Sequence, residues 1–353
     1  MKNSKRVKLK ELLAERITKG EFSFGDRFPG LHQLCKEYGI SYVTVNKAMK
    51  MLVKEGYLLA KNGVGYSVCY VQPNVVSTKK IVNFITKLTS SNPVWPVIEN
   101  GKKLFEQAGW EVNIYTIPDG DLSGCVPLLN SPDAYSVLFF TRVNWENFSA
   151  TFGHISKRVI VIGQLSGNTD ITSIISDEYE TVRRCVEYFR STNHHRTGLI
   201  SYASNKELEM LRIAAWRSIM IADGTPRREL DQLCFAFDPN NIPKDDQAIK
   251  EAFKSWLLKI KGKIDSVIVP YAPTTFAEVC KESGLKIPED ISIIAISGCS
   301  PASSNPPIPI IDNDLPKHFE YAFNILEDRF KTGNNSPGAW NFCPPGKLIL
   351  KKN

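Results

Sequence analysis

Short apolar runs alternate with helix-like segments along residues 80–353, and this alternation constrains the fold most strongly. Runs such as "KIVNFI", "RVIVIG" and "DSVIVP" are rich in Val and Ile, and amphipathic stretches such as "DEYETVRRCVEYFRST" separate them. A run that is apolar at nearly every position predicts a strand buried on both faces, as in a parallel sheet covered by helices. We therefore expect an α/β chain whose roughly ten βαβ-type strands form two doubly wound lobes.

Ligands of such folds bind at the carboxyl ends of the strands, so we expect a ligand site in a cleft between the lobes. No Gly-x-Ser-x-Gly elbow, P-loop or Gly-x-Gly-x-x-Gly fingerprint occurs in the sequence, and these are common marks of catalytic or nucleotide sites. The 8 cysteines include no Cys-x-x-Cys, and the 5 histidines form no metal-binding pair. We predict that the chain is not an enzyme and needs no metal or cofactor.

The excess positive charge is confined to the N-terminal fifth of the chain. Residues 1–70 contain 13 Lys+Arg and 6 Asp+Glu, whereas residues 71–353 contain 31 of each. A compact basic module predicts a polyanionic partner, and nucleic acid is favoured over a membrane surface because no strongly apolar helix face accompanies the charge. The sequence has no membrane-length apolar run and no apolar segment of a secretory signal, so we expect a cytoplasmic protein.

The basic module has the pattern of three helices and a hairpin. Helical spacing relates Leu9, Leu12, Leu13 and Ile17 in the first segment, Leu31, Leu34 and Cys35 in the second, and Val45, Ala48, Met49 and Leu52 in the third. "KNGVG" then predicts a hairpin turn between two short strands. This order predicts a winged helix-turn-helix domain over residues 1–72, a linker over 73–79 and the two-lobed domain over 80–353.

The third segment, "GISYVTVNKAMKMLVKEGYL", is the predicted reading helix. Ser41 is the expected N-cap, and the helix start would meet base edges in a DNA major groove. Valine or threonine methyl groups there can pack against the thymine methyl. The alternative is that Val43 is a tolerated surface residue and Tyr42 a packing aromatic.

These residues resemble the GntR family of bacterial regulators. The family pattern is matched by "GEFSFGDRFP", "GISYVTVNKAMKMLVKEGYL" and "NGVGYSV", which together cover most of residues 7–71. The resemblance implies DNA contacts by the reading segment and by a glycine-bearing wing. His32, Tyr42 and Asn46 stand where the family usually has arginines, so the family's common G/C-containing operator is not expected here. The expected DNA-binding residues are His32, Ser41, Tyr42, Val43, Thr44, Asn46, Lys47, Lys50, Gly63 and Gly65.

The larger part resembles the effector domain of the lac-repressor/galactose-repressor family, which is related to periplasmic sugar-binding proteins. The matching blocks are "NHHRTGLIS", "RIAAW" and "GLKIPEDISIIAIS". The resemblance implies that Arg212 clamps ligand hydroxyls and that Trp95 stacks on a sugar. The family's clamping aspartate is Ser297 here, and its Asn-Asp pair is Tyr271-Ala272. A structural ion pair for Arg212 and lobe packing for Trp95 are the alternatives. The expected effector-binding residues are Trp95, Asp177, Lys206, Arg212, Tyr271 and Ser297.

Together these features predict a one-component transcriptional regulator, with repression as the default direction. We expect a homodimer that binds an inverted-repeat operator in double-stranded DNA and responds to a small effector, with a sugar as the leading class. The alternative is a DNA-binding protein whose second domain no longer binds a ligand.

Overall fold

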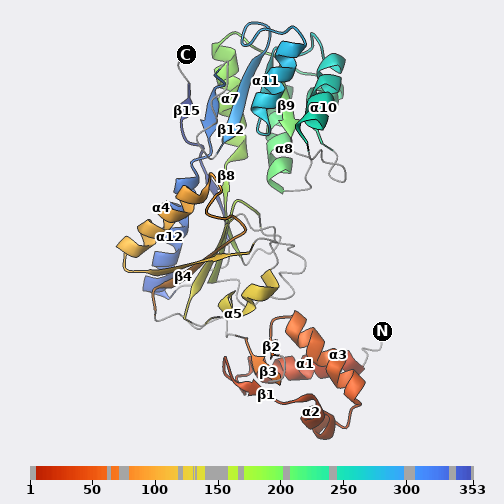
Figure 1. Ribbon diagram of the computed structural model, residues 1–353, viewed down its shortest axis with the longest axis vertical. Coiled ribbons are helices and arrows are strands. Elements are labelled where there is room, and N and C mark those ends of the chain that lie inside the picture. Colours follow the sequence, from red (N-terminus) through yellow and green to blue (C-terminus); the bar gives the residue numbers. More distant parts are fainter. Residues whose placement is uncertain are drawn as a thin grey trace. The chain divides into compact units, whose positions relative to one another are not determined.

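The chain divides into two compact units and passes from one to the other three times (Figure 1). One unit comprises Met1–Ile174 with Phe319–Asn341, and the other comprises Ile175–His318 with Phe342–Asn353. The computed structural model describes residues 5–61, 65–70, 79–117, 122–129, 131, 133–139, 158–165, 171–201, 207–237, 245–297, 307–333 and 339–350. Residues 71–78, which include most of the predicted linker over 73–79, lie outside the described residues. The predicted domain boundaries therefore stay a prediction.

The N-terminal module has the predicted order of three helices and a hairpin. Its elements are α1 (Lys5–Thr18), β1 (Arg27–Phe28), α2 (Leu31–Tyr38), α3 (Tyr42–Lys54), β2 (Leu58–Lys61) and β3 (Gly65–Val68). The strands pair antiparallel in the order β1-β3-β2. Strand β1 was not predicted, because two residues are too few to display a strand period.

The core of this module is built from one face of each helix. Leu9, Leu13 and Ile17 of α1 pack with Leu34 of α2 and with the buried residues of α3. Leu12 was expected on the same face but is 42% exposed. The four-residue steps from Leu9 to Ile17 define the buried stripe, and Leu12 lies about 100° away from Leu13 around the helix.

The first lobe contains a six-stranded sheet in the order β14-β8-β7-β6-β4-β5. Five neighbouring strands pair parallel, as expected for strands buried on both faces. Its strands are β4 (Ile81–Thr86), β5 (Glu111–Thr116), β6 (Tyr135–Phe139), β7 (Val159–Ile162), β8 (Thr172–Ser176) and β14 (Trp340–Cys343), and its helical segments are α4 (Trp95–Gln107), η1 (Leu122–Cys125), α5 (Val126–Leu129) and α12 (Leu315–Thr332).

Helices α4 and α12 approach each other closely at Gly101. A Cβ at this position would lie 2.5 Å from the Phe319 ring, so only glycine fits without displacing that ring. Phe319 in turn packs against Phe84 of β4, with ring centroids 5.3 Å apart. The contact therefore joins a helix late in the chain to the first strand of the lobe.

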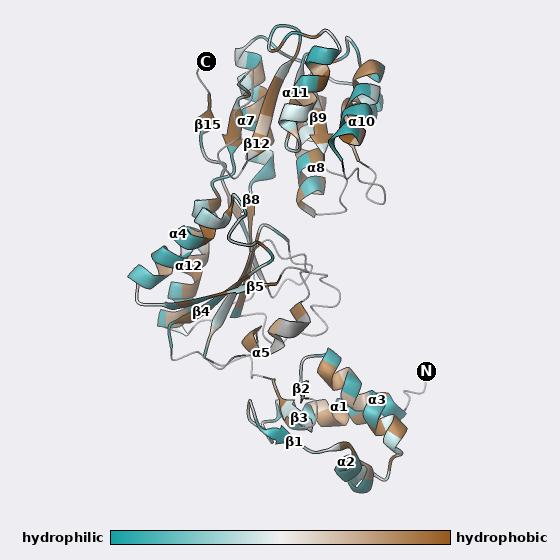
Figure 2. Cartoon of the chain, viewed as in Figure 1, coloured by the Kyte–Doolittle hydropathy of each residue, from teal (hydrophilic) through white to brown (hydrophobic). Residues whose placement is uncertain are grey.

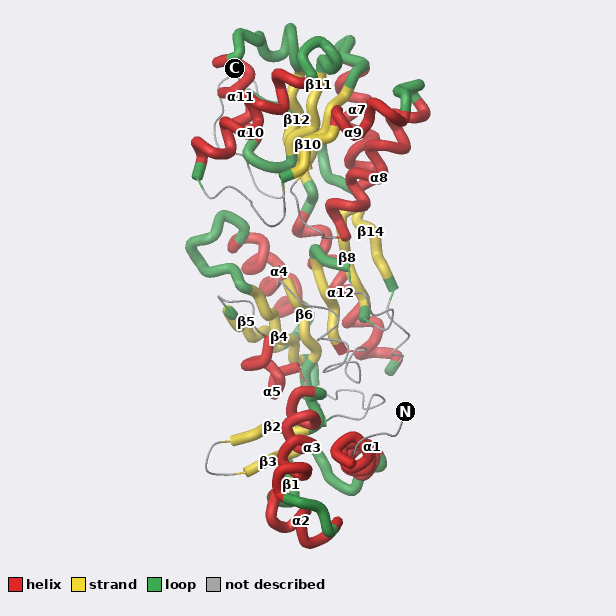
Figure 3. The backbone as a smooth tube through the Cα atoms, turned by 90° about the vertical axis from the view of Figure 1, so that its right-hand side faces the viewer, coloured by secondary structure: helices red, strands yellow, loops and turns green. Residues whose placement is uncertain are grey.

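The second lobe contains another six-stranded sheet, in the order β10-β9-β11-β12-β13-β15. All neighbours pair parallel except β15, which is antiparallel to β13. Figure 3 shows α10 and α11 on one side of this sheet and α7 and α8 on the other. Its strands are β9 (Thr197–Ser201), β10 (Cys234–Ala236), β11 (Ser266–Val269), β12 (Ser292–Ser297), β13 (Ile310–Asp312) and β15 (Leu348–Ile349), and its helices are α7 (Glu178–Ser191), α8 (Glu207–Ala222), α9 (Arg227–Leu233), α10 (Asp246–Lys259) and α11 (Pro273–Glu282).

The predicted two-lobed α/β architecture is confirmed, and each of the ten apolar runs contains a strand. Figure 2 shows the apolar strands of the second lobe beside helices banded in hydrophilic and hydrophobic residues, which is the pattern that predicted them. Strands β13 and β14 and helices α9 and α12 were missed. In "PIPIIDND" prolines precede the short apolar run, and only one of the four positions of "WNFC" is buried, so neither reads as a buried strand.

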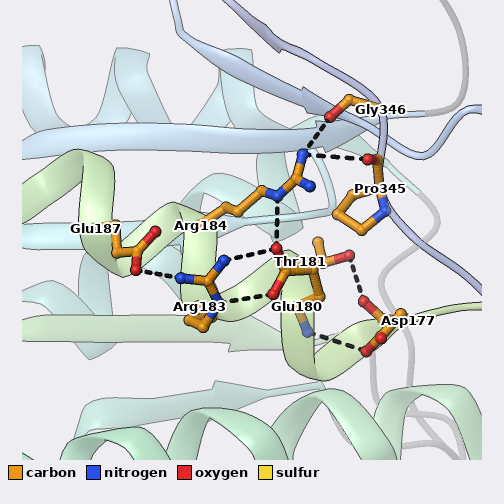
Figure 4. Close-up of polar contacts among 8 residues, drawn as sticks. All are labelled: Asp177, Glu180, Thr181, Arg183, Arg184, Glu187, Pro345 and Gly346. Carbon is orange, nitrogen blue, oxygen red and sulfur yellow. Dashed lines mark hydrogen bonds and ion pairs between the residues drawn. The ribbon is translucent and has the colours of Figure 1, made fainter.

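Helix α7 is bonded to the segment before β15 through Arg184, in the middle of the helix (Figure 4). Asp177 caps α7, because its carboxylate accepts a hydrogen bond of 3.0 Å from the Glu180 N–H. Glu180 pairs with Arg183 and Arg184, which hold the pKa of its carboxyl at about 2. Arg184 Nη1 also donates to the Gly346 carbonyl at 2.8 Å, so one side chain links α7 to the segment before β15.

Arg184→Ala is expected to lower the free energy of unfolding by about 1–2 kcal/mol, because charge-assisted bonds to two carbonyls and a carboxylate are lost from a partly exposed site. Arg183→Ala is the matched control, since the hydrogen bonds of Arg183 in the described part of the chain go to Glu180 and Glu187 of the same helix. Its loss is expected to be the smaller one, because exposed ion pairs contribute little to stability. Urea denaturation of the full chain measures both values. Equal losses would show that the link to the C-terminal segment adds nothing.

Candidate DNA-reading surface and effector site

Helix α3 presents opposite chemistry on its two faces. Val45, Ala48, Met49 and Leu52 are buried in the module core, as predicted. At about 100° per residue, positions 43, 46, 47 and 50 fall on the opposite face within a sector of about 100°. Val43, Lys47 and Lys50 are exposed there, and Asn46 is half-buried. The surface stripe thus begins with an apolar side chain and an amide and continues with two cations.

A tight turn places the start of α3. Gly39 ends α2 in the left-handed conformation at φ 64°, which favours glycine, and its N–H donates to the Cys35 carbonyl. Ser41 occupies the predicted N-cap position, and its carbonyl accepts from the N–H groups of Thr44 and Val45. Its hydroxyl does not cap a backbone N–H but pairs with the Thr44 hydroxyl at 3.0 Å. Two side-chain oxygens therefore lie together in the first turn.

Two aromatic rings meet beside this turn. The His32 ring, at the start of α2, contacts the Tyr42 ring with centroids 5.3 Å apart and planes inclined by 40°. On β3, burial is the main cause that raises the pKa of the Tyr66 phenol, and the Tyr42 phenol adds to the rise. Sequence reasoning missed Tyr66, because a tyrosine in a short strand carries no sign of what it faces.

The predicted wing is formed by the antiparallel pair β2 and β3. Gly65 adopts φ 105°, which L side chains rarely do, so the glycine is required by the hairpin geometry. Gly63 lies outside the described residues. The DNA contacts of all these residues stay a prediction.

In the second lobe, Arg212 of α8 is held by two carboxylates. Its Nε and Nη2 donate to the two oxygens of Glu178 at 2.7 and 2.9 Å. Its Nη1 donates to both oxygens of Glu209, at 3.1 and 3.0 Å. Ser201, which ends β9, donates its hydroxyl to Glu209 at 2.9 Å. Glu178 was not predicted, since only contact in space reveals that it is the partner of Arg212.

This cluster is charged although it is almost closed to solvent. Arg212 is 6% exposed and Glu178 is 4% exposed. Burial disfavours the charged guanidinium, but the two carboxylates outweigh that effect and raise the pKa of Arg212. Burial raises the pKa of Glu178, and the pairing with Arg212 opposes the rise. With both carboxylates ionised, the cluster carries one excess negative charge, and most guanidinium donors are already used by protein oxygens.

The remaining predicted effector residues lie at several places. Tyr271 follows β11, and Phe237 follows β10. Their rings pack together with centroids 5.7 Å apart. Because β9, β10 and β11 are parallel, Tyr271, Phe237 and Ser201 share the carboxyl edge of one sheet. Asp177 caps α7, next to Glu178. Ser297 ends β12, paired in register with Asp312. Lys206 lies outside the described residues.

Trp95 belongs to the other unit, where it begins α4. Its indole N–H donates to Glu99 Oε1 at 3.0 Å, one turn along the same helix. The ring is partly exposed. Stacking of Trp95 on a ligand, and ligand contact by the second-lobe residues, stay predictions.

Neither a metal site nor a membrane segment is evident in the part of the chain that the structure describes. No group of three or more His, Cys, Asp or Glu side chains among these residues could hold a metal ion. None of the described helices is both long and apolar enough to cross a membrane.

The N-terminal module matches the model of a known family. The family model of the bacterial regulatory proteins, gntR family, matches residues 5–68. An uncharacterized HTH-type transcriptional regulator of Bacillus subtilis (strain 168), YurK, is 39% identical over 59 residues, 17% of this chain and 24% of that protein. The histidine utilization repressor of Klebsiella aerogenes is 36% identical over 58 residues, 16% of this chain and 24% of that protein. The chain thus spans a quarter or less of the curated relatives that it matches.

The larger part has the fold of LacI-type regulators. A complex of the transcriptional regulator CelR with cellobiose superposes with a TM-score of 0.62 at 14% identity, covering 92% of this chain and 99% of that one. A regulatory protein of the LacI family from Chloroflexus aggregans gives 0.63 at 13% identity, covering 77% of this chain and 97% of that one. The predicted architecture, a GntR-type helix-turn-helix joined to a LacI-like two-lobed domain, is confirmed.

Arg212→Met is expected to lower the free energy of unfolding by about 3–5 kcal/mol, because it leaves Glu178 buried without its partner. The double variant Glu178→Met, Arg212→Met is expected to recover much of that loss, since no unpaired buried charge remains at Glu178. Urea denaturation measures the free energy of unfolding of both single variants, Arg212→Met and Glu178→Met, and of the double variant. A double variant as unstable as the sum of the single variants would contradict a coupled buried pair.

Proposed function

We propose that this chain is a sequence-specific DNA-binding transcriptional regulator whose affinity for its operator changes when a small effector binds. The observation that carries the proposal is the exposed stripe of α3, with Val43, Asn46, Lys47 and Lys50, inside a segment that matches the gntR family. This face is not used by the module core. One α-helix fits a DNA major groove, so the stripe has the dimensions and the charge for that role.

The proposed DNA contacts differ between the first turn of α3 and the turns that follow. The first turn, from Ser41 to Thr44, would reach base edges, whereas Lys47 and Lys50 would neutralise phosphates. The wing, β2 and β3, would lie along the backbone beside the helix. Two such modules in a homodimer would read an inverted repeat, because a two-fold axis in the protein is matched by one in the operator.

The effector is a sugar or a related small metabolite. The LacI-type fold and the cellobiose complex of the neighbour CelR support this class. The carboxyl edge of the second sheet offers Ser201, Tyr271 and the Arg212 cluster as polar and aromatic groups for it. An effector that binds one arrangement of the chain better than another would change operator affinity, and the operator would change effector affinity by the same factor. Relief of repression is the proposed direction.

A second candidate function is constitutive DNA binding with a ligand-free second domain. The pairing of Arg212 with Glu178 and Glu209 favours it, because the arginine that the resemblance assigns to the ligand already has protein partners. The replacement of the family's clamping aspartate by Ser297 favours it too. The two candidates make the same prediction for DNA and opposite predictions for sugars.

Selection from a random duplex pool with the full chain is expected to enrich one inverted repeat. The double variant Lys47→Ala, Lys50→Ala should bind that duplex more weakly. It should reduce the slope of log affinity against log salt by about 4, because the homodimer loses two phosphate contacts in each subunit. The control Lys254→Ala, Lys259→Ala removes the same charge from exposed positions of α10 and should leave the slope unchanged. Binding without enrichment of any sequence would overturn the proposal.

A panel of neutral sugars then separates the two candidates. A sugar that raises the melting temperature and also changes operator affinity supports the effector-coupled regulator. If no sugar changes either quantity while operator binding is intact, the constitutive candidate stands.

A further inference from the structure

We infer that the first turn of α3 recognises thymine methyl groups through apolar contact, with Val43 as the contacting residue and His32 as the residue that positions the adjoining Tyr42 ring. The inference rests on the proposed function and names the base chemistry that the same surface reads. It starts from an exposed apolar pair, since Val43 is 61% exposed and Tyr42 is 47% exposed.

Charge is absent from the part of α3 that would enter the groove first. The segment from Ser41 to Asn46 contains no ionisable side chain other than the Tyr42 phenol, and the first cation is Lys47. Bidentate contact with guanine, the commonest specific contact in a major groove, uses the cation of arginine or lysine. A tip of this composition is therefore suited to a different feature of the base edges.

The major groove offers one apolar group, the 5-methyl of thymine. Val43 lies at the second helical position, on the face opposite the buried residues Val45 and Ala48. Its isopropyl group is not part of the module core, so it is available for contact with DNA. Contact with a thymine methyl would bury it.

The neighbouring groups hold this surface in one arrangement. Tyr42 packs against the His32 ring, with the centroids 5.3 Å apart. Ser41 and Thr44 are joined through their hydroxyls at 3.0 Å. An apolar contact is specific only when its position is defined, because dispersion attraction falls off over a fraction of an ångström. His32 therefore acts through Tyr42, as a positioning residue for the reading turn.

The test uses the duplex that the full chain selects from a random pool. Each thymine is replaced in turn by deoxyuridine, which removes only the 5-methyl group. At one or more positions in each half-site the wild-type affinity should fall by about fourfold, the loss expected for one buried methyl group. Val43→Ala should bind the thymine and deoxyuridine duplexes nearly equally. Lys50→Ala, the control, should weaken binding to both duplexes and keep their ratio.

His32 is tested by the same ratio, which a merely structural role would not change. His32→Ala should reduce the thymine-to-deoxyuridine ratio, and His32→Phe, which keeps a ring against Tyr42, should restore it. Melting curves confirm that each variant is folded. Equal wild-type affinity for thymine and deoxyuridine at every position, or an unchanged ratio in Val43→Ala, overturns the inference. Failure to enrich any sequence overturns the proposed function instead, so the two failures are distinct.

Discussion

Parallel strands that are buried on both faces are the constraint on which most of this structure depends. Such strands have no solvent-facing side, so helices must cover both faces and return the chain to the same edge of the sheet. The carboxyl ends of the parallel strands then lie at one edge. In the second lobe this brings together Ser201, Phe237 and Tyr271, which are far apart in the sequence. The proposed effector site follows from the strand direction before any side chain is considered.

The Arg212 cluster gives that edge an unusual electrostatic character. A buried guanidinium usually needs partners to offset its desolvation, and here Glu178 and Glu209 supply them from within the chain. The arrangement leaves an excess of carboxylate over guanidinium. Carboxyl oxygens accept hydrogen bonds, so the cluster suits a partner rich in hydroxyl donors. A neutral sugar is consistent with this balance.

In the proposed function, helix α3 of the N-terminal module separates two tasks along its length. Apolar and hydroxyl groups occupy the first turn of α3, and lysines occupy the turns that follow. Lysine contacts with phosphate give affinity that depends on salt but carries little sequence information. In the proposed function, sequence preference would depend on the uncharged turn, where the Tyr42 ring packs against the His32 ring and the hydroxyls of Ser41 and Thr44 pair.

The local pattern of the sequence was by itself enough to predict most of the helices and strands. The buried stripe of α3, the hairpin at β2 and β3, and the apolar runs of both sheets were predicted, because helix and strand periods and turn residues are local properties. Strands β13 and β14 were missed, since runs of three or four residues near prolines or with exposed side chains carry too little period. Only the tertiary structure decided which partners the polar residues have. The contacts of Arg212 with Glu178, Tyr42 with His32, and Arg184 with the Gly346 carbonyl join segments distant in sequence, and spacing along a chain does not encode such distances.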